Sequence, residues 1–205
     1  VLAKPPTVGV VAANAPVPVS SAGTLGSVVA PPDEAVVEKS PPPDEGWVEA
    51  QSPVLLGDVC LTIDRVTVGK LILRNRITNE ASQISKDELL SISLTIQNTS
   101  QNRKIDYRSW GQDVPFADNC ELSDNFGNRY RSTHFTPLSV PEGSVVSGSL
   151  YPGKQVSDVI AFERPIPTAE QLFLELPGSN VGQSGAVFRI KIPVSMIGQG
   201  TPAPT

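Results

Sequence analysis

The sequence predicts an all-β chain: an antiparallel β-sandwich of seven or eight strands, preceded by a proline-rich extended arm. Three observations support this prediction. From Leu55 onward, apolar residues recur at every second position in short runs, which is the period of a β-strand. Pro and Gly interrupt these runs, and no run shows a convincing helical period. Ten of the 20 prolines lie in residues 1–53, where Trp47 is the single aromatic residue.

The clearest strand covers residues 90–97, where Leu and Ile alternate with Ser, Thr and Gln. One apolar and one polar face are typical of an antiparallel sheet. Residues 59–68 also alternate, but the apolar positions slip by one near Asp64, which predicts a β-bulge. Residues 118–133 predict a hairpin, with Gly127 supplying the positive φ of its turn. Together with further short runs, these strands favour a sandwich, with a closed barrel as the alternative.

The chain divides by composition into an arm at residues 1–53, a β-sandwich at residues 54–197 and a C-terminal tail at residues 198–205. The arm holds two basic and six acidic residues, and the remainder holds 14 basic and 15 acidic residues. The acidic character of the chain, whose net charge is -5, therefore belongs to the arm. Because no cluster of Lys and Arg is present, we expect neither a nucleic-acid partner nor binding to an anionic membrane surface.

Short β-branched pieces recur in the arm and are candidates for binding a partner. Proline confines such pieces to edge strands, and they suit a strand added to another subunit's sheet. Composition alone favours a disordered spacer, because few apolar side chains are available to form a core. Our leading hypothesis is that the arm docks on a neighbouring chain. The candidate partner-binding residues are Val8, Val10, Val11, Val17, Val19, Leu25, Val28 and Val29.

The order of the turns in residues 55–197 resembles a known family. The motifs that carry the resemblance are Asn98-Thr-Ser100, Asp124-x-x-Gly-Asn-x-Tyr130, Pro152-Gly-Lys154 and Phe162-Glu-Arg-Pro165. They are similar to those of the small immunoglobulin-like domains of bacterial lipoproteins, secreted antigens and surface proteins, many of unknown function. The resemblance implies an immunoglobulin-like β-sandwich, an extracytoplasmic location and a binding or structural role without catalytic residues.

The chain opens at Val1, and we expect a removed export signal or anchor upstream of it, with an arbitrary start as the alternative. No apolar run in the sequence approaches the length of a transmembrane helix. The expected location is therefore the periplasm, the cell surface or the extracellular medium.

Cys60 and Cys120 are the two cysteines of the chain. In an exported protein they could form a disulfide that closes a loop of about 60 residues and stabilises the fold by about 4 kcal/mol. Strand parity points Cys60 away from the core and Cys120 toward it. Two free thiols are therefore an equal alternative.

The sequence offers no candidate catalytic residue. The single histidine, His134, has no cysteine or second histidine near it with which to bind a metal. Asp118, Glu121 and Asp124 form the densest group of carboxylates and are a weak calcium candidate, but a hairpin turn explains the same residue types. We expect no enzymatic activity and no cofactor.

These observations predict a non-catalytic extracytoplasmic structural or interaction module. In this hypothesis the chain is a subunit of a cell-surface or envelope assembly, and its arm docks on a neighbouring chain. The alternative is a monomeric ligand- or peptide-binding domain carried on a flexible spacer.

Overall fold

The computed structural model of the chain describes residues 46–111, 119–135 and 138–200. The chain divides into two units, Val1–Val37 and Glu38–Thr205, and every described residue belongs to the second unit. The candidate partner-binding residues of the arm lie outside the described residues. Within the described ranges no residue belongs to an α-helix, so none of them forms a helix able to cross a membrane.

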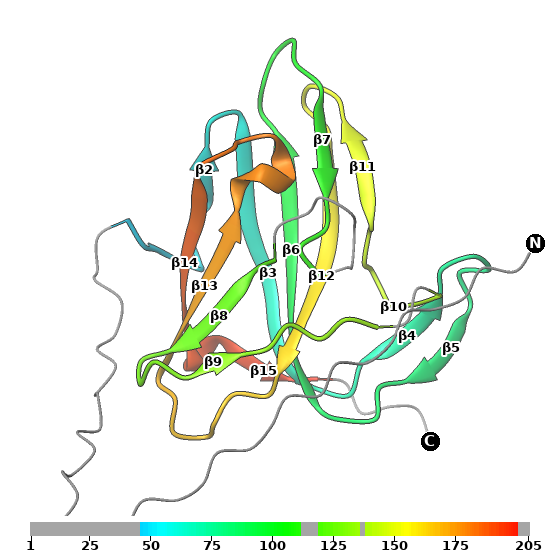
Figure 1. Cartoon of the computed structure of the whole chain (residues 1–205), viewed down its shortest axis with the longest axis vertical. Helices are drawn as coiled ribbons and strands as arrows, with labels where there is room; N and C mark the ends of the chain where they lie inside the picture. The colour runs from blue at the N-terminus through cyan, green and yellow to red at the C-terminus, as the bar shows by residue number, and fades with distance from the viewer. Residues whose placement is uncertain (1–45, 112–118, 136–137, 201–205) are drawn as a thin grey trace, which may run out of the picture. The chain divides into compact units, whose positions relative to one another are not determined.

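Two sheets form the body of the domain (Figure 1). The first, sheet A, has the strand order β1 (Val48–Glu49), β14 (Val187–Pro193), β13 (Gln171–Pro177), β8 (Glu121–Asp124) and β9 (Arg129–Tyr130). The second, sheet B, has the order β12 (Gln155–Glu163), β6 (Leu89–Asn98), β3 (Val59–Gly69) and β15 (Ile197–Gln199), and β2 (Val54–Leu56) also pairs with β3. The apolar faces of the two sheets enclose one core, which confirms the predicted immunoglobulin-like β-sandwich.

Two smaller sheets flank the sandwich. Sheet C has the order β10 (Ser139–Pro141), β4 (Ile72–Asn75) and β5 (Ala81–Ile84). Sheet D pairs β11 (Ser147–Leu150) with β7 (Ile105–Arg108). Two 3-10 turns, η1 (Gly178–Val181) and η2 (Val194–Met196), follow β13 and β14. The described residues form fifteen strands, more than the seven or eight that alternation predicts, because strands of two to four residues are too short to show a period.

The alternating pattern of the sequence corresponds to burial in the core. In β6 the residues Leu90, Ile92, Leu94 and Ile96 are fully buried, as predicted. The register of β3 against β6 shifts between Ile63 and Arg65, which confirms the predicted bulge. The bulge keeps the apolar residues on both sides of it directed at the same core.

The predicted hairpin is formed by β8 and β9. Gly127 lies in its turn with φ +78°, the left-handed conformation that favours glycine. Asp124 precedes the turn, and its carboxylate accepts the backbone N–H groups of Phe126 and Asn128, both at 2.9 Å. The Asp-x-x-Gly-Asn motif is therefore explained by turn formation.

The sheets extend beyond the predicted limits of the sandwich. Val48–Glu49, placed in the arm by composition, pairs in parallel with β14, and Gly198 and Gln199, placed in the tail, pair in parallel with β3. Strands this short carry no recognisable alternation. The chain ends pass closely here, because a Cβ on Gly200 would lie 3.2 Å from the Cα of Gly69 and would require a shift of a few tenths of an ångström.

The glycine-rich segment between β13 and β14 is a closely packed turn. Gly178 begins η1, and a Cβ at this position would lie 2.6 Å from the carbonyl oxygen of Gln183. Gly182 ends η1 with φ +74° and donates its N–H to the η1 carbonyls. The glycines of this segment therefore allow close backbone packing.

Candidate interaction surface

Sheet C extends away from the sandwich at one side of the domain (Figure 1). Its central strand, β4, pairs with β10 on one side and with β5 on the other. Leu73 and Val140, on β4 and β10, are its buried apolar residues. The outer strand, β5, pairs with no described strand on its other side.

Local hydrogen bonds hold the turn between β4 and β5 in one conformation. The side-chain oxygen of Asn75 accepts the N–H groups of Ile77 (2.8 Å) and Thr78 (3.2 Å). Asn79 adopts a positive φ of +60°, which asparagine tolerates better than most residues. Arg74 donates a hydrogen bond to the carbonyl oxygen of Asn79 at 2.8 Å. The side chain of Ile77 is therefore displayed on an ordered turn.

Large apolar side chains are exposed on sheet C and its turn. The exposed fractions are 78% for Ile77, 54% for Leu138 and 41% for Ile84. Ile77 and Leu138 lie close together, because the N–H of Arg76 donates to the carbonyl oxygen of Leu138 at 2.9 Å. An apolar group rimmed by polar residues is typical of a surface that binds another protein.

The outer edge of β5 carries backbone hydrogen-bonding groups that pair with no other described strand. Ser85 N–H donates to Leu71 C=O at 2.8 Å, and the next hydrogen-bonded pair of this antiparallel ladder is Leu73 with Gln83. Ile84 lies between them in the alternation, so its N–H and C=O point away from β4. The sequence of β5 contains neither proline nor a charged residue, which are the usual protections of an exposed edge.

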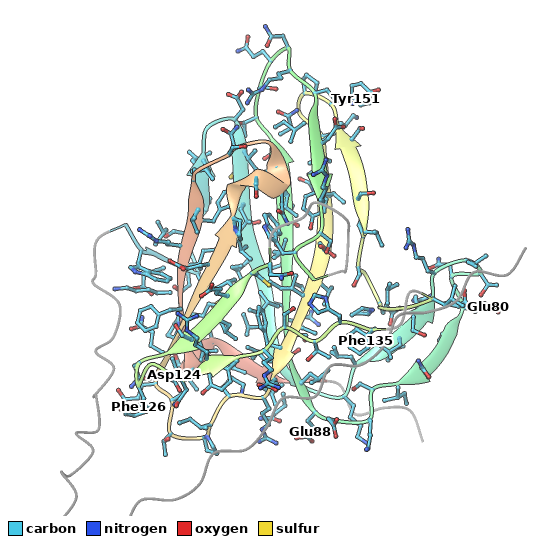
Figure 2. The ribbon with its side chains drawn as sticks, viewed as in Figure 1. Glu80, Glu88, Asp124, Phe126, Phe135 and Tyr151 are labelled. Carbon is cyan, nitrogen blue, oxygen red and sulfur yellow. The ribbon has the colours of Figure 1, made fainter. Side chains whose placement is uncertain are left out.

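Basic residues outnumber acidic residues along sheet C. Residues 70–86 contain four basic residues and one acidic residue, Glu80, which Figure 2 shows at the outer end of the sheet, and the acidic pair Asp87-Glu88 follows directly. Arg74 is paired with Glu142. The exposed Lys70, Arg76 and Lys86 form no ion pair with any described residue.

A cleft of about 340 Å³ lies beside sheet C. Its walls come from β4, from β10 and from the segment that leads into β11. Both Arg74 and Arg76 line the cleft, together with the hydroxyl-bearing Ser144 and Ser147. Sheet C therefore offers an apolar tip, an open strand edge and a basic cleft.

The end of the predicted arm is fixed to sheet A. The ring of Trp47 packs edge-on against Phe173, with ring centroids 5.0 Å apart. Val48–Glu49 forms β1, and the N–H of the buried Ala50 donates to the carbonyl oxygen of Lys191 at 2.8 Å. Residues 47–50, which composition places in the arm, therefore form part of sheet A and its packing.

Two of the three calcium candidates, Glu121 and Asp124, lie on opposite faces of β8. Asp118 lies outside the described residues. Glu121 is exposed and paired with Arg129 at 3.3 Å, whereas Asp124, three residues on, is buried on the opposite face of β8. Within the described ranges no group of three metal-ligating side chains is present.

Asp124 accepts four hydrogen bonds from the hairpin. Besides two backbone N–H groups, it accepts the amide of Asn128 at 2.8 Å and the hydroxyl of Tyr130 at 2.6 Å. Burial by itself raises the pKa of Asp124, but these hydrogen bonds outweigh it and hold the pKa below its usual value. Burial, followed by the carboxylate of Asp124, raises the pKa of Tyr130 to about 12.

Replacing Asp124 with asparagine is expected to lower the free energy of unfolding at neutral pH by about 1–3 kcal/mol. Because the folded pKa of Asp124 is lowered, its stabilising contribution is present above about pH 4 and is lost as the pH falls through the folded value. The loss on substitution should therefore shrink in acid, as urea unfolding across the pH range would measure. Glu121→Gln, on the exposed face of the same strand, is the control and should change stability by less than about 0.5 kcal/mol. If Asp124→Asn lowers the free energy of unfolding equally at every pH, the folded pKa of Asp124 is not lowered and the prediction is wrong.

Both cysteines are free thiols, so the disulfide alternative is not realised. Cys60 is half-buried and Cys120 is buried, as their parity predicts. Burial raises the pKa of the Cys120 thiol to about 11, and the thiol donates to the carbonyl oxygen of Trp110 at 3.5 Å. His134 is exposed.

A buried carboxylate, Asp158, was missed by the sequence analysis. It lies on β12 and points into the core. One of its oxygens accepts the N–H groups of Val145 (3.0 Å) and Val159 (2.7 Å). The other accepts the hydroxyl groups of Tyr107 and Ser109, the latter at 2.6 Å. Three of these bonds, from Tyr107, Ser109 and Val145, join other segments of the chain to β12.

Burial raises the pKa of Asp158, while its four hydrogen bonds act in the opposite direction. Its neighbour Tyr107 also has a raised pKa, first because of burial and then because of the adjacent carboxylate. The sequence does indicate that Asp158 is buried, because it alternates in register with Val156 and Ile160 and interrupts an apolar face. A carboxylate on a core-facing position needs hydrogen-bond donors.

Comparison with known proteins gives similarity in structure alone. No family model and no curated protein matches the chain. The solved structures that resemble it include the yjhA protein of Bacillus subtilis, with 16% identity over 70% of this chain and 98% of that chain and a TM-score of 0.47. Others are the secreted protein MPT63 of Mycobacterium tuberculosis (9% identity, 72% and 95% of the two chains, TM-score 0.42) and an uncharacterised β-sandwich protein of Clostridium difficile (12%, 73% and 98%, TM-score 0.41).

These similar structures come from bacterial proteins, and they include a secreted protein and a β-sandwich protein. They do not assign the chain to a family. At these TM-scores the likeness adds nothing about function, which has to be argued from the surface of this chain.

Proposed function

We propose that this chain is a non-catalytic extracytoplasmic interaction module, a subunit of a cell-surface or envelope assembly whose N-terminal arm docks on a neighbouring chain. The observation that carries the proposal is the root of the arm. Trp47 and β1 attach the end of the arm to sheet A. A neighbouring chain that binds the arm would therefore be joined to the folded domain. The extracytoplasmic location is supported by the Pro-, Ala- and Val-rich arm and by the family resemblance.

The non-catalytic part of the proposal is supported by how the buried carboxylates are used. Asp124 and Asp158 each accept four hydrogen bonds from groups of the fold. Their perturbed pKa values therefore have a structural cause. Sheet C, in contrast, presents exposed apolar side chains and an edge with which no described strand pairs.

Deletion of residues 1–45 tests the proposal. The core residues lie between Ala50 and Ile192, so the shortened chain retains the complete core. Sedimentation velocity should show that the full chain associates in a concentration-dependent manner and that the shortened chain remains monomeric. Equal association of the two chains would refute arm docking.

The alternative, a monomeric ligand- or peptide-binding domain on a spacer, is favoured by one observation, the basic cleft beside sheet C. NMR relaxation of the full chain separates the two functions. Arm residues 1–40 that move independently of the domain at every protein concentration would support the spacer, and arm residues that become ordered as the chain associates would support docking.

A further inference from the structure

We infer that the edge of β5 is the site where the arm docks, and that its occupant is the acidic segment 33–40 from a second copy of this chain. The segment would add a strand to sheet C. This inference rests on the proposed function and deepens it by naming the docking site and the partner. Three properties of the described surface and of the arm lead to it.

The first property is the open edge. Ile84 directs its N–H and C=O away from β4, and no described strand pairs with this side of β5. The long strand β12 also lies at an edge, but there Thr133 N–H donates to Ala161 C=O and Glu163 N–H donates to Arg131 C=O. An edge without such partners is a template for strand addition.

The second property is the chemistry around the edge. Ile84 and the turn residue Ile77 are exposed beside β5, and β-branched pairs across strands stabilise a sheet. The edge of β11, in contrast, presents Ser147, Gly148 and Ser149. Sheet C is therefore the described edge best suited to an apolar strand.

The third property is charge. Arg76, Lys70 and Lys86 are exposed near β5 without a described ionic partner. Residues 33–45 of the arm contain five acidic residues and one basic residue, and within them segment 33–40 (Asp-Glu-Ala-Val-Val-Glu-Lys-Ser) is free of proline. It is the stretch of the arm that combines acidic residues with adjacent valines, so it matches both the charge and the apolar character of the site.

The position at which the arm joins sheet A, at Trp47 and β1, favours a second copy of the chain as the source of the segment. The six steps from Ser40 to Gly46 span at most about 22 Å. A domain of about 155 residues has a radius of gyration of about 15 Å and is thus about 40 Å across. In Figure 1 the blue segment that carries β1 and the β4–β5 hairpin lie on opposite sides of the domain. Segment 33–40 therefore reaches the β5 edge of a neighbouring copy more readily than its own.

Replacing Ile84 with proline tests whether the arm adds a strand at the edge of β5. Because the N–H of Ile84 points outward, Ile84→Pro removes the group needed by an added strand without removing a bond to β4. Ile84→Thr is the matched control, since it shortens the side chain but keeps the N–H. In the full chain, Ile84→Pro is expected to weaken self-association, measured by sedimentation equilibrium, about tenfold more than Ile84→Thr does.

Exchanging charges tests whether segment 33–40 is the segment that binds at β5, and this test does not use a proline substitution. Full chains carrying Glu34→Lys with Glu38→Lys, or Arg76→Glu with Lys86→Glu, should each associate about tenfold more weakly than the unmodified chain. A chain that carries both pairs of substitutions should recover association. Lys154→Glu with Arg103→Glu, at the other end of the sandwich, is the control and should leave association unchanged.

The outcomes separate this inference from the proposed function. If deletion of residues 1–45 abolishes association but the Ile84 variants and the charge exchange leave it unchanged, the arm docks elsewhere and the inference is wrong. If the shortened chain associates as well as the full chain, the proposed function fails. Loss of association in both single charge variants with recovery in the combined variant supports the inference.

Discussion

Replacing Asp158 with alanine is expected to lower the free energy of unfolding by about 4 kcal/mol. The side chain is fully buried, and its removal leaves two backbone N–H groups and two hydroxyl groups without their acceptor. Each buried donor left unpaired costs about 1–3 kcal/mol, part of which the hydroxyl groups recover by rotating toward other acceptors. Urea unfolding followed by far-UV circular dichroism would measure the loss.

Two further variants separate the hydrogen bonds from the packing of Asp158. Asp158→Asn keeps the shape of the side chain but exchanges one acceptor oxygen for a donor, so it should lose less than Asp158→Ala. Tyr107→Phe removes one donor together with its bond, and its loss should be about 1–2 kcal/mol. The double variant Asp158→Ala with Tyr107→Phe should lose less than the sum of its parts, because it leaves one donor fewer unpaired. Additive losses, or a loss below about 1 kcal/mol for Asp158→Ala, would show that the carboxylate does not organise these segments.

Trp110→Ala is the second large effect, with an expected loss of about 3–5 kcal/mol. Trp110 is almost completely buried and packs edge-on against Tyr107 and Phe188, with ring centroids 5.5 and 6.2 Å away. Its indole N–H donates to the carbonyl oxygen of Pro177 at 2.9 Å. This one side chain thus joins the segment after β7 to both β13 and β14 of sheet A.

The comparison with Trp110→Phe identifies the source of the loss. Phenylalanine keeps an aromatic ring in the core but leaves Pro177 C=O without its donor, so we expect an intermediate loss of about 1–3 kcal/mol. Trp47 is the other tryptophan of the chain, and its fluorescence in the Trp110 variants reports separately on the arm root. Equal losses for the two substitutions would contradict the packing role of the ring.

The sequence predicts the central strands well because the alternation that identifies a strand lies within the strand itself. Leu90, Ile92, Leu94 and Ile96 alternate over a whole strand, and the slip near Asp64 is the bulge. Turn chemistry is also local, which explains why the hairpin around Gly127 is predicted. Such patterns depend only on which face of a strand is buried.

Long-range pairings explain what the sequence does not predict. Sheet C joins β4 to β10, which lies more than 60 residues further along the chain, and no local pattern encodes that pairing. The packing of Trp47 against Phe173 likewise joins residues that lie far apart in the sequence. Glu121 and Asp124 appear as a cluster in the sequence, but the period of a strand places them on opposite faces. The candidate surface therefore becomes visible only when the strands are assembled.

Hydrogen–deuterium exchange at the amide of Ile84 tests the central claim most directly. This N–H points away from β4 and has no described strand to receive it. If arm docking on β5 is correct, the amide exchanges slowly in the full chain at concentrations where it associates, and rapidly in the chain that lacks residues 1–45. The amide of Gln83, bonded within sheet C, should be protected in both chains. Rapid exchange of Ile84 in the associated full chain, or equal exchange in the two chains, would contradict the account.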